Sequence, residues 1–174
     1  MITGRDASVI EFVDMVKVAK TSTLSSLFYP SYTVAARRLS EIARSGELER
    51  DRDGWSSEYI YYRRKPKQIR HALALSDFYR ELSKQAEIKK FIVEPTLGDI
   101  RPDAVVGFIA SDRERIALVE IELSNKGFDY HKYASFGWQK FFPWQPELIV
   151  VTNQDIRNTG YKTLAIKLDM QFHI

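Results

Sequence analysis

The chain contains no cysteine and only three histidines, His71, His131 and His173, among its 174 residues. Without cysteine there is no disulfide framework, no thiol nucleophile and no Cys-based zinc site. The scattered histidines also argue against a His-rich metal site, so any metal ion would be a hard cation held by carboxylates. We expect His71 to pack or cap on a helix, and an alternative for His131 is contact with phosphate beside Lys132.

Long apolar runs are missing as well. No stretch approaches the roughly 18 apolar residues that a membrane-spanning helix needs. The first residues, MITGRDASVIEF, place an acid early and lack the basic start and apolar core of a signal peptide. We therefore expect a cytoplasmic protein without a membrane partner. The 44% hydrophobic and 28% charged fractions are those of an ordinary globular chain of one domain or two small ones.

The positive charge is unevenly distributed. The formal net charge is +3. Basic residues outnumber acidic ones in residues 1–70, whereas the two kinds nearly balance over the rest of the chain. A local basic excess is the electrostatic signature of a nucleic-acid-binding domain, so any such contact is expected in the first part.

Apolar spacing predicts three short helices in the first third of the chain. Val9, Phe12, Val13 and Val16 would share one face of the first helix. In the third, Val34, Ala35, Leu39 and Ile42 would form the inward stripe. The expected caps and ends of the second and third helices are Thr21 or Ser22, Pro30, Ser31 or Thr33, and Gly46.

A hairpin is predicted to follow these helices. Residues 47–65 alternate on both sides of Asp53-Gly54, which is a strong hairpin signal. Three short helices followed by a hairpin favour a winged helix-turn-helix over residues 1–66. We place the boundary at Pro66, which breaks the last strand.

The second half changes to an α/β pattern, expected to form a separate domain over residues 67–174. A helix around residues 66–87 would use Ile69, Leu73, Phe78 and Leu82 as its apolar side. Strands are expected at 89–94, 103–109 and 116–123, then a partly helical segment at 125–142 and a buried strand at 146–153. The C-terminus is ambiguous, with a short helix followed by an edge strand as one interpretation.

The DNA-facing side chains would come from the third helix and the hairpin. In a winged helix the third helix enters the major groove and the hairpin touches the backbone. Arginine can donate two hydrogen bonds to guanine, and basic side chains bind phosphate. The candidate contacts with double-stranded DNA are Tyr32, Thr33, Arg37, Arg38, Arg50, Arg52, Trp55, Arg63, Arg64 and Lys65. The alternative is a packing or protein-contact module whose arginines form a solvated face.

Carboxylates at strand ends mark a second candidate site. Asp103 opens one expected strand, and Glu120 and Glu122 end the next. Side chains alternate along a strand, so the two glutamates share a side, and pairing of the strands would bring Asp103 near Glu120. Clustered carboxylates repel one another unless a cation lies between them, which makes a site for Mg²⁺ or Mn²⁺ one interpretation. The other is edge charges paired with Arg101, Lys126 or Lys132.

These motifs carry a family resemblance. The segments RPDAVV and VEIEL resemble the PD-(D/E)XK nuclease superfamily, which places an Asp at the start of one strand and a (D/E)-x-K triplet on the next. More closely, the order of TVAARRLSEIARSGEL, HALALSDFYREL, RPDAVV, LVEIEL and HKYASF resembles the replication-relaxation family of plasmid and phage proteins. That resemblance implies a winged helix joined to a restriction-endonuclease-like α/β core.

The resemblance also implies roles for particular residues. Asp103 and Glu120 take the metal-binding positions, while Glu122 falls where the superfamily has its lysine, which is a departure from the pattern. Lys132 could replace that lysine, giving Asp103, Glu120, Glu122 and Lys132 as the candidate catalytic set. An acid of the upstream helix, Asp77 or Glu81, sometimes joins such a site. Tyr133 and Gln139 would flank it.

Three functions follow from this reading. The first is site recognition on DNA in replication or transfer of a mobile element or phage, with metal-dependent cleavage or nicking as its catalytic form. The second is a non-enzymatic DNA-binding regulator whose nuclease-like domain is degenerate and serves dimerisation or docking of replication or transfer proteins. A winged helix that binds only protein is the third. The aromatic residues Phe136, Trp138, Phe141, Phe142 and Trp144 would form a core, a homodimer patch or a stacking surface for unpaired bases.

Overall fold

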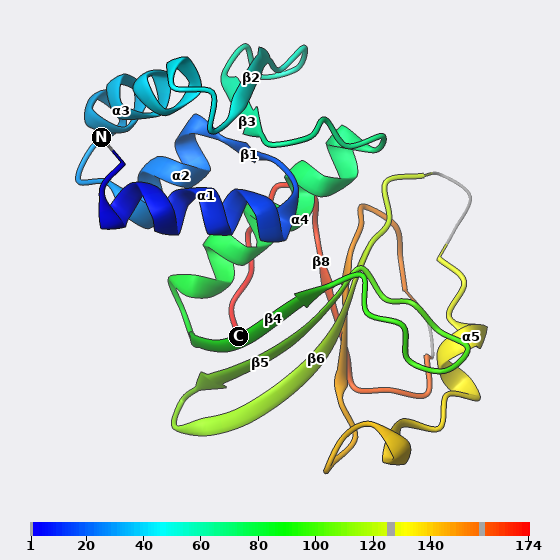
Figure 1. Ribbon diagram of the computed structural model, residues 1–174. Helices are drawn as coiled ribbons and strands as arrows, with labels where there is room; N and C mark the ends of the chain where they lie inside the picture. The colour runs from blue at the N-terminus through cyan, green and yellow to red at the C-terminus, as the bar shows by residue number, and fades with distance from the viewer. Residues whose placement is uncertain (1, 125–127, 157–158) are drawn as a thin grey trace. The chain divides into compact units, whose positions relative to one another are not determined.

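The computed structural model (Figure 1) describes residues 2–124, 128–156 and 159–174. Over these residues the chain is a mixed α+β protein with five α-helices and two sheets. It divides into two compact units, Met1–Arg80 and Glu81–Ile174. None of the described helices is both long enough and apolar enough to cross a bilayer.

The first unit combines short helices with a three-stranded antiparallel sheet. Its elements are α1 (Gly4–Val16), β1 (Ala19–Lys20), α2 (Thr21–Phe28), α3 (Tyr32–Arg44), β2 (Glu49–Arg52), β3 (Tyr59–Tyr62) and most of α4 (Ile69–Ser83). The strand order is β1-β3-β2. The three expected helices are confirmed, and the two-residue strand β1, which is too short to leave a pattern in the sequence, was not anticipated.

Helix boundaries in this unit follow capping chemistry. Thr3 and Asp6 form a reciprocal capping box at the start of α1. Ser31 caps α3 by accepting a hydrogen bond from the Val34 amide, and Gly46, with φ +82°, follows its end. The cap expected for α2 is wrong, because Lys20 precedes that helix without a side-chain cap and the Thr21 hydroxyl instead donates to the Tyr59 carbonyl.

The predicted hairpin is confirmed, but its turn is different. Strands β2 and β3 pair in antiparallel fashion from Glu49–Tyr62 to Arg52–Tyr59. The loop between them spans residues 53–58, and the Asp53 amide donates to the Glu58 carbonyl across 2.8 Å. Asp53 is buried, and the hydrogen bonds that its carboxylate accepts from the Ser56 amide and hydroxyl offset the cost of that burial. The Asp-Gly pair therefore opens a longer loop, hereafter loop 53–58, in which an Asx-type bond fixes the backbone.

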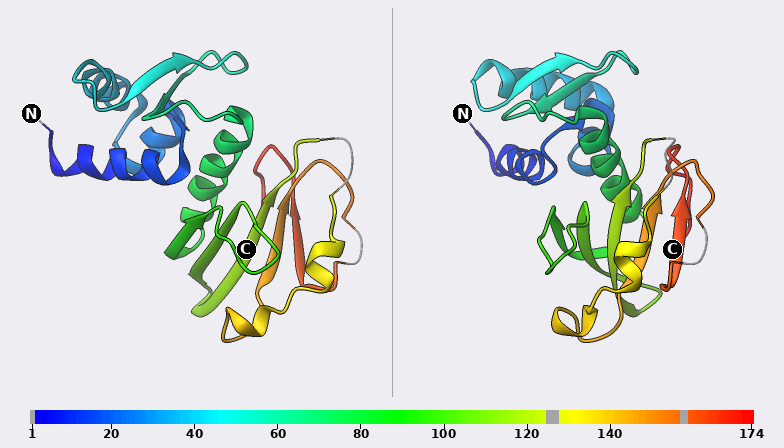
Figure 2. Two further views of the ribbon diagram at one scale, coloured as in Figure 1. Left: turned by 45° about the vertical axis from the view of Figure 1, so that its right-hand side comes forward. Right: turned by 90° about the vertical axis from the view of Figure 1, so that its right-hand side faces the viewer.

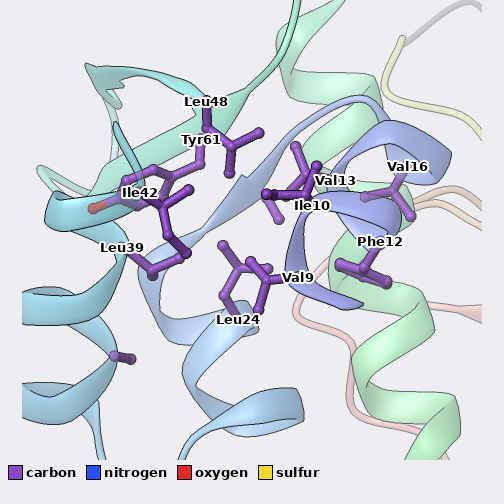
Figure 3. Close-up of a cluster of buried hydrophobic side chains, with 12 residues drawn as sticks. Val9, Ile10, Phe12, Val13, Val16, Leu24, Leu39, Ile42, Leu48 and Tyr61 are labelled. Carbon is purple, nitrogen blue, oxygen red and sulfur yellow. The ribbon is translucent and has the colours of Figure 1, made fainter. Parts of the chain in front are cut away.

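Apolar side chains of α1, α2, α3 and the sheet form the core of the first unit (Figure 3). Val9, Val13 and Leu24 are fully buried there, together with Leu39 from α3. The expected stripes of α1 and α3 therefore face this core, apart from Val34, which is only half-buried. These contacts fix α3 to the rest of the unit along one side and leave its other side in solvent.

The second unit is built on one five-stranded mixed sheet (Figure 2). Its strands, in spatial order, are β4 (Glu87–Val93), β5 (Ala104–Ala110), β6 (Arg113–Ile121), β7 (Glu147–Val151) and β8 (Thr163–Ile166). The first three pair in antiparallel fashion, whereas β7 and β8 run parallel to their neighbours. The four expected strands are confirmed within a few residues, and β8 provides the expected edge strand. Edge strand β4 contains a register shift between Ile88 and Lys90.

The segment between β6 and β7 is only partly helical, as expected. It forms α5 (His131–Ala134) and a single 3-10 turn (Trp138–Lys140). Residues 125–127 at its start lie outside the described part. Residues 159–162 before β8 form no helix, in contrast to one interpretation of the C-terminus.

The two units divide fourteen residues after the boundary suggested by Pro66. Pro66 does follow the end of β3, but most of the next helix, α4, belongs to the first unit. Asp77 of α4 explains this grouping, because it accepts hydrogen bonds from Lys20 and from the buried Thr23 hydroxyl. A proline can end a strand without ending the unit that contains it.

Replacing Asp6 with asparagine should destabilise the first unit. The hydrogen bond from Arg38 is the main reason that the pKa of the buried Asp6 carboxyl lies well below its ordinary value. Because the folded pKa is lowered, the carboxylate stabilises the fold above about pH 4, and this contribution is lost as the pH falls toward the folded pKa. We expect Asp6→Asn to cost about 3 kcal/mol at pH 7 and progressively less below pH 4, measured by denaturant unfolding.

Asp14→Asn is the matched control on the same helix. The Asp14 carboxylate pairs with Arg63 across 2.9 Å, but its side chain is 44% exposed. An exposed ion pair contributes little, so this change should alter the free energy of unfolding by less than about 1 kcal/mol. Equal losses in the two variants would contradict the role assigned to Asp6.

Candidate nucleic-acid interface and carboxylate site

Three of the predicted DNA contacts on α3 are exposed. Tyr32 is 49% exposed, and Thr33 and Arg37 are exposed as well. Thr33 and Arg37 lie on the side of the helix away from the buried residues Ala35 and Leu39, whereas Tyr32 is the first helical residue, on the same face as Ala35. Within the described part of the chain, Arg37 forms no hydrogen bond or ion pair, so its guanidinium is available to a ligand.

Arg38, the neighbouring arginine, has a structural position instead. Its Nε donates to Asp6 across 2.9 Å, and its terminal nitrogens contact Asp6 and Glu41. The Asp6 side chain is only 1% exposed, so this interaction joins α3 to α1 at the edge of the core. The sequence places both arginines outside the apolar stripe, but only Arg37 faces solvent without a partner.

The hairpin presents arginines that stack on aromatic rings. The Arg50 and Arg52 guanidinium groups lie 4.5 Å and 4.2 Å from the centroid of the Tyr59 ring. Arg52 also donates to the Ser57 carbonyl across 2.8 Å. Trp55 in loop 53–58 is 76% exposed, and the Arg70 guanidinium of α4 lies 4.5 Å from its ring centroid. The hairpin therefore holds its cations in fixed orientations through cation–π contacts.

The basic residues after β3 also differ in whether they have a partner within the protein. Arg63 pairs with Asp14, and Lys65 pairs with Asp51 across 2.6 Å. Arg64 is exposed and has no hydrogen-bond or ion-pair partner among the described residues. Of the three, Arg64 is the side chain most available to an external phosphate.

The sheet of the second unit brings Asp103 and Glu120 together. The antiparallel register pairs Ala104 with Val119, so Asp103, one residue before Ala104, and Glu120, one residue after Val119, are cross-strand neighbours. Asp103 accepts a hydrogen bond from the Ile121 amide across 2.6 Å, which holds it against the end of β6. Glu120 is 8% exposed, on the sheet face that also carries Leu118. The predicted proximity of the two acids is therefore present.

Lys132 and Tyr133 supply the partners of the buried glutamate. The Lys132 ammonium lies 2.7 Å from Glu120 Oε1, and the Tyr133 hydroxyl donates to the same oxygen. Burial raises the pKa of Glu120 above its ordinary value, and the two hydrogen bonds oppose that rise. Burial and the Glu120 carboxylate also raise the pKa of Tyr133, so its hydroxyl stays protonated and keeps its donor. One oxygen of Glu120 is thus held by a cation and a neutral donor together.

The other acids proposed for this site are engaged elsewhere. Glu122 lies just past the end of β6, and its carboxylate accepts a hydrogen bond from the Ser124 amide. Asp77 is bound by Lys20 and Thr23 in the first unit, and Glu81 pairs with Lys84 across 2.8 Å. Among the described residues, no three acidic or histidine side chains form a group that could hold a metal ion.

Two carboxylates nevertheless satisfy the minimum that a magnesium ion needs from a protein. Mg²⁺ is commonly held by one or two carboxylates, with waters and phosphate oxygens completing its shell. Asp103 and Glu120 would be those ligands, and the buried Glu120 already requires a positive partner, which Lys132 supplies. The donor set therefore fits a hard cation, provided that solvent or substrate oxygens complete the coordination.

The remaining candidates lie around this site or at the surface. Of the proposed edge pairs, Lys132 does pair with Glu120, Arg101 pairs with Glu94 across 3.4 Å, and Lys126 lies outside the described residues. Gln139 is exposed in the 3-10 turn. His71 is partly buried on α4, as expected, and His131 is exposed with its ring against Tyr130.

The aromatic residues after α5 are divided between core and surface. Phe136 and Phe142 pack on the cluster formed by Leu118, Leu148 and Tyr133. The side chains of Phe141 and Trp144 remain about two-fifths exposed. This cluster therefore serves mainly as core, with two rings left at the surface.

Two contacts go beyond what the sequence predicted. Tyr133, expected only to flank the site, is fully buried and donates directly to the glutamate. Arg70 reaches Trp55 from α4, a contact between residues that are distant in the sequence. Only the register of the sheet and the path of α4 bring these groups together.

Comparison of the chain with protein-family models, curated proteins and solved structures gives no match.

Removing the Tyr133 hydroxyl should weaken the second unit. In Tyr133→Phe, Glu120 loses one of its two donors while it remains buried, so we expect a loss of about 2 kcal/mol in the free energy of unfolding. Urea unfolding in a Trp55→Phe background would measure it, because the other two tryptophans, Trp138 and Trp144, both report on the second unit.

Tyr161→Phe is the matched control in the same cluster. The Tyr161 ring packs edge-on against Tyr133, and its buried hydroxyl has no hydrogen-bond partner among the described residues. Its removal leaves no group unpaired, so the change should be neutral or slightly stabilising. A loss as large as that of Tyr133→Phe would show that packing, not the bond to Glu120, explains both.

Proposed function

We propose that the protein binds double-stranded DNA through its first unit, which acts as a winged helix. The order α1-β1-α2-α3-β2-β3 supports this, because it places a third helix before a hairpin that can serve as the wing. In such folds the recognition helix enters the major groove, with its N-terminal residues facing the base edges. The early residues of α3 exposed here are Tyr32, Thr33 and Arg37.

The exposed, unpartnered guanidinium of Arg37 is the observation on which this proposal depends. Arg38, Arg63 and Lys65 are paired with Asp6, Asp14 and Asp51. Arg37 keeps all its hydrogen-bond donors for a ligand. A planar guanidinium on the exposed side of a helix is suited to paired hydrogen bonds with guanine or to a phosphate.

A second function, metal-dependent cleavage or nicking of DNA, is favoured by the position of Lys132. In this proposal the second unit is a nuclease-like core, and Asp103 and Glu120 bind Mg²⁺ or Mn²⁺. The bound ion would activate water and stabilise charge on the phosphodiester. Lys132 lies beside Glu120 and could orient the attacking water. That is the role of the superfamily's lysine, whose position is occupied here by Glu122. Tyr133 fixes the Glu120 carboxylate against the sheet.

The setting that we propose is recognition of a DNA site in replication or transfer of a mobile element or phage. This rests on the order of motifs, which resembles that of the replication-relaxation family. The alternative is an accessory DNA-binding protein in which the nuclease-like unit docks a partner or a second copy. The Glu120–Lys132 pair is compatible with that alternative, because a degenerate site can keep its buried acid neutralised by a lysine.

Arg37→Ala should weaken binding to duplex DNA roughly tenfold. The loss follows from removing the one exposed α3 arginine that has no partner. Fluorescence anisotropy with a labelled duplex at several salt concentrations would measure it, since phosphate contacts also make the affinity fall with salt. A protein that binds no duplex even at low salt would contradict DNA recognition and favour a protein-binding winged helix.

Lys162→Ala is the control for net charge. It removes one positive charge from the second unit, where Lys162 is exposed and paired with Glu147. If the affinity for duplex falls equally in both variants, only the total charge of the protein matters and α3 has no special part.

Asp103→Asn should abolish both metal binding and nicking. The amide keeps the shape of the side chain and an acceptor for the Ile121 amide but lacks the charge that a divalent cation requires. We expect Mn²⁺ to raise the melting temperature of the wild type but not that of the variant. Nicking of supercoiled plasmid should fall roughly a hundredfold or more.

Asp112→Asn provides the comparison for this test. Asp112 is exposed in the β5–β6 turn with φ +59°, a conformation that asparagine tolerates well. Its Mn²⁺ response and nicking should equal those of the wild type. Metal binding at Asp103 without any nicking would identify the non-enzymatic alternative, whereas equal nicking in all three proteins would remove the site assignment.

A further inference from the structure

A cavity of about 380 Å³ lies between loop 53–58 and the start of α4. This volume is within the range of about 300–1,000 Å³ that is common for small-ligand sites. Its walls combine the Trp55 ring, the cations Arg52 and Arg70, and the carboxylate of Asp51. The apolar side chains Ile60 and Ile69, together with Asp53, Gly54 and Lys65, complete the lining. All of these residues belong to the first unit.

The exposed tryptophan is the feature of this cavity that most strongly indicates a ligand. Trp55 is the most exposed of the large apolar side chains described, at 76%. The Arg70 guanidinium covers part of its ring, 4.5 Å from the centroid, and the rest of the ring remains in solvent. A flat aromatic surface with a guanidinium beside it is a platform on which a nucleobase can stack.

Of the two acids that line this cavity, Asp51 favours a nucleobase over a bare phosphate as the ligand. Asp51 Oδ2 accepts hydrogen bonds from the Tyr62 hydroxyl and the Lys65 ammonium. No described residue donates to Asp51 Oδ1, so that oxygen remains an acceptor. A carboxylate repels phosphate, but it accepts hydrogen bonds from the ring N–H or amino groups of a base.

These groups suit only a base that is not paired. In a duplex, the Watson–Crick donors of a base are already bonded and both of its faces are stacked. An unpaired base offers a free face to Trp55 and a free donor to Asp51. Its own phosphate would remain near the cations Arg52 and Arg70, which lie on the same walls.

We propose that this cavity binds an unpaired nucleobase of DNA by stacking on Trp55. The inference rests on the proposed function, and it narrows the DNA partner to a duplex that carries an unpaired nucleotide beside the segment contacted by α3. Trp55 and Asp51 read the unpaired base, and Arg52 and Arg70 hold its phosphate. The hairpin thereby distinguishes a junction between single and double strands from a continuous duplex.

Three labelled DNAs test this assignment with the full chain. The first is a blunt duplex, the second adds a one-nucleotide unpaired extension, and the third carries an abasic sugar-phosphate in place of that nucleotide. Anisotropy titrations should show the second DNA bound roughly tenfold more tightly than the first, which corresponds to the stacking of one base. The third should bind like the first, because it supplies the phosphate without the base.

Trp55→Ala should remove this preference, so that the extended and the blunt DNA bind with nearly equal affinity to the variant. Tyr32→Ala is the matched aromatic control, since Tyr32 is also exposed but lies on α3. It should weaken all three DNAs equally and so preserve the preference. A preference that survives in Trp55→Ala, or equal binding of the base-bearing and abasic extensions by the wild type, would overturn the inference.

The outcomes separate this inference from the proposed function. Equal binding of all three DNAs overturns the base site and leaves duplex recognition standing. Binding of the extended DNA without any binding of blunt duplex overturns the proposed duplex recognition and supports the base site. A titration with deoxyadenosine monophosphate alone, followed by tryptophan fluorescence, tests whether the cavity binds a free nucleotide. Trp55-dependent binding of that nucleotide with no gain from the extension would overturn the assignment to DNA.

Discussion

A buried carboxylate must be matched by donors or cations, and this requirement organises both units of the protein. In the first unit Asp6 is held by Arg38 and by the Thr3 cap, which joins α1 to α3. In the second, Glu120 is held by Lys132 and Tyr133. Each pairing connects segments that are distant in the sequence. Because the unpaired charge would be costly in the interior, these contacts fix geometry more strictly than the surrounding apolar side chains do.

The same requirement gives neighbouring side chains different roles, one structural and one exposed to solvent. Arg38 points toward the core and completes a helix–helix contact, whereas Arg37, one residue earlier, faces solvent without a partner. In the same way, Lys132 turns toward the carboxylate while His131 stays exposed. A rotation of about 100° per helical residue is sufficient to separate a structural side chain from one that is free to meet a ligand.

Local patterns in the sequence were enough to predict the helices, the hairpin and the strands. Register followed from alternation, which is why the closeness of Asp103 and Glu120 could be expected from RPDAVV and VEIEL. The longer loop 53–58 could not, because the bonds that Ser56 donates to Asp53 replace the two-residue turn expected from Asp-Gly. The short strand β1 could not, because it depends on pairing with the distant Tyr61. The burial of Tyr133 and the stacking of Arg70 on Trp55 depend on packing across long sequence separations, which no local pattern encodes.

The register shift in β4 has a consequence for the behaviour of the protein at high concentration. This strand lies at one edge of the five-stranded sheet, where unpaired backbone groups could add strands from another molecule. The shift between Ile88 and Lys90 interrupts the regular ladder, and the exposed charged residues Glu87, Lys89 and Lys90 line the strand. Irregular spacing and charged side chains together oppose edge-to-edge aggregation, so the sheet can end at β4 without a covering strand.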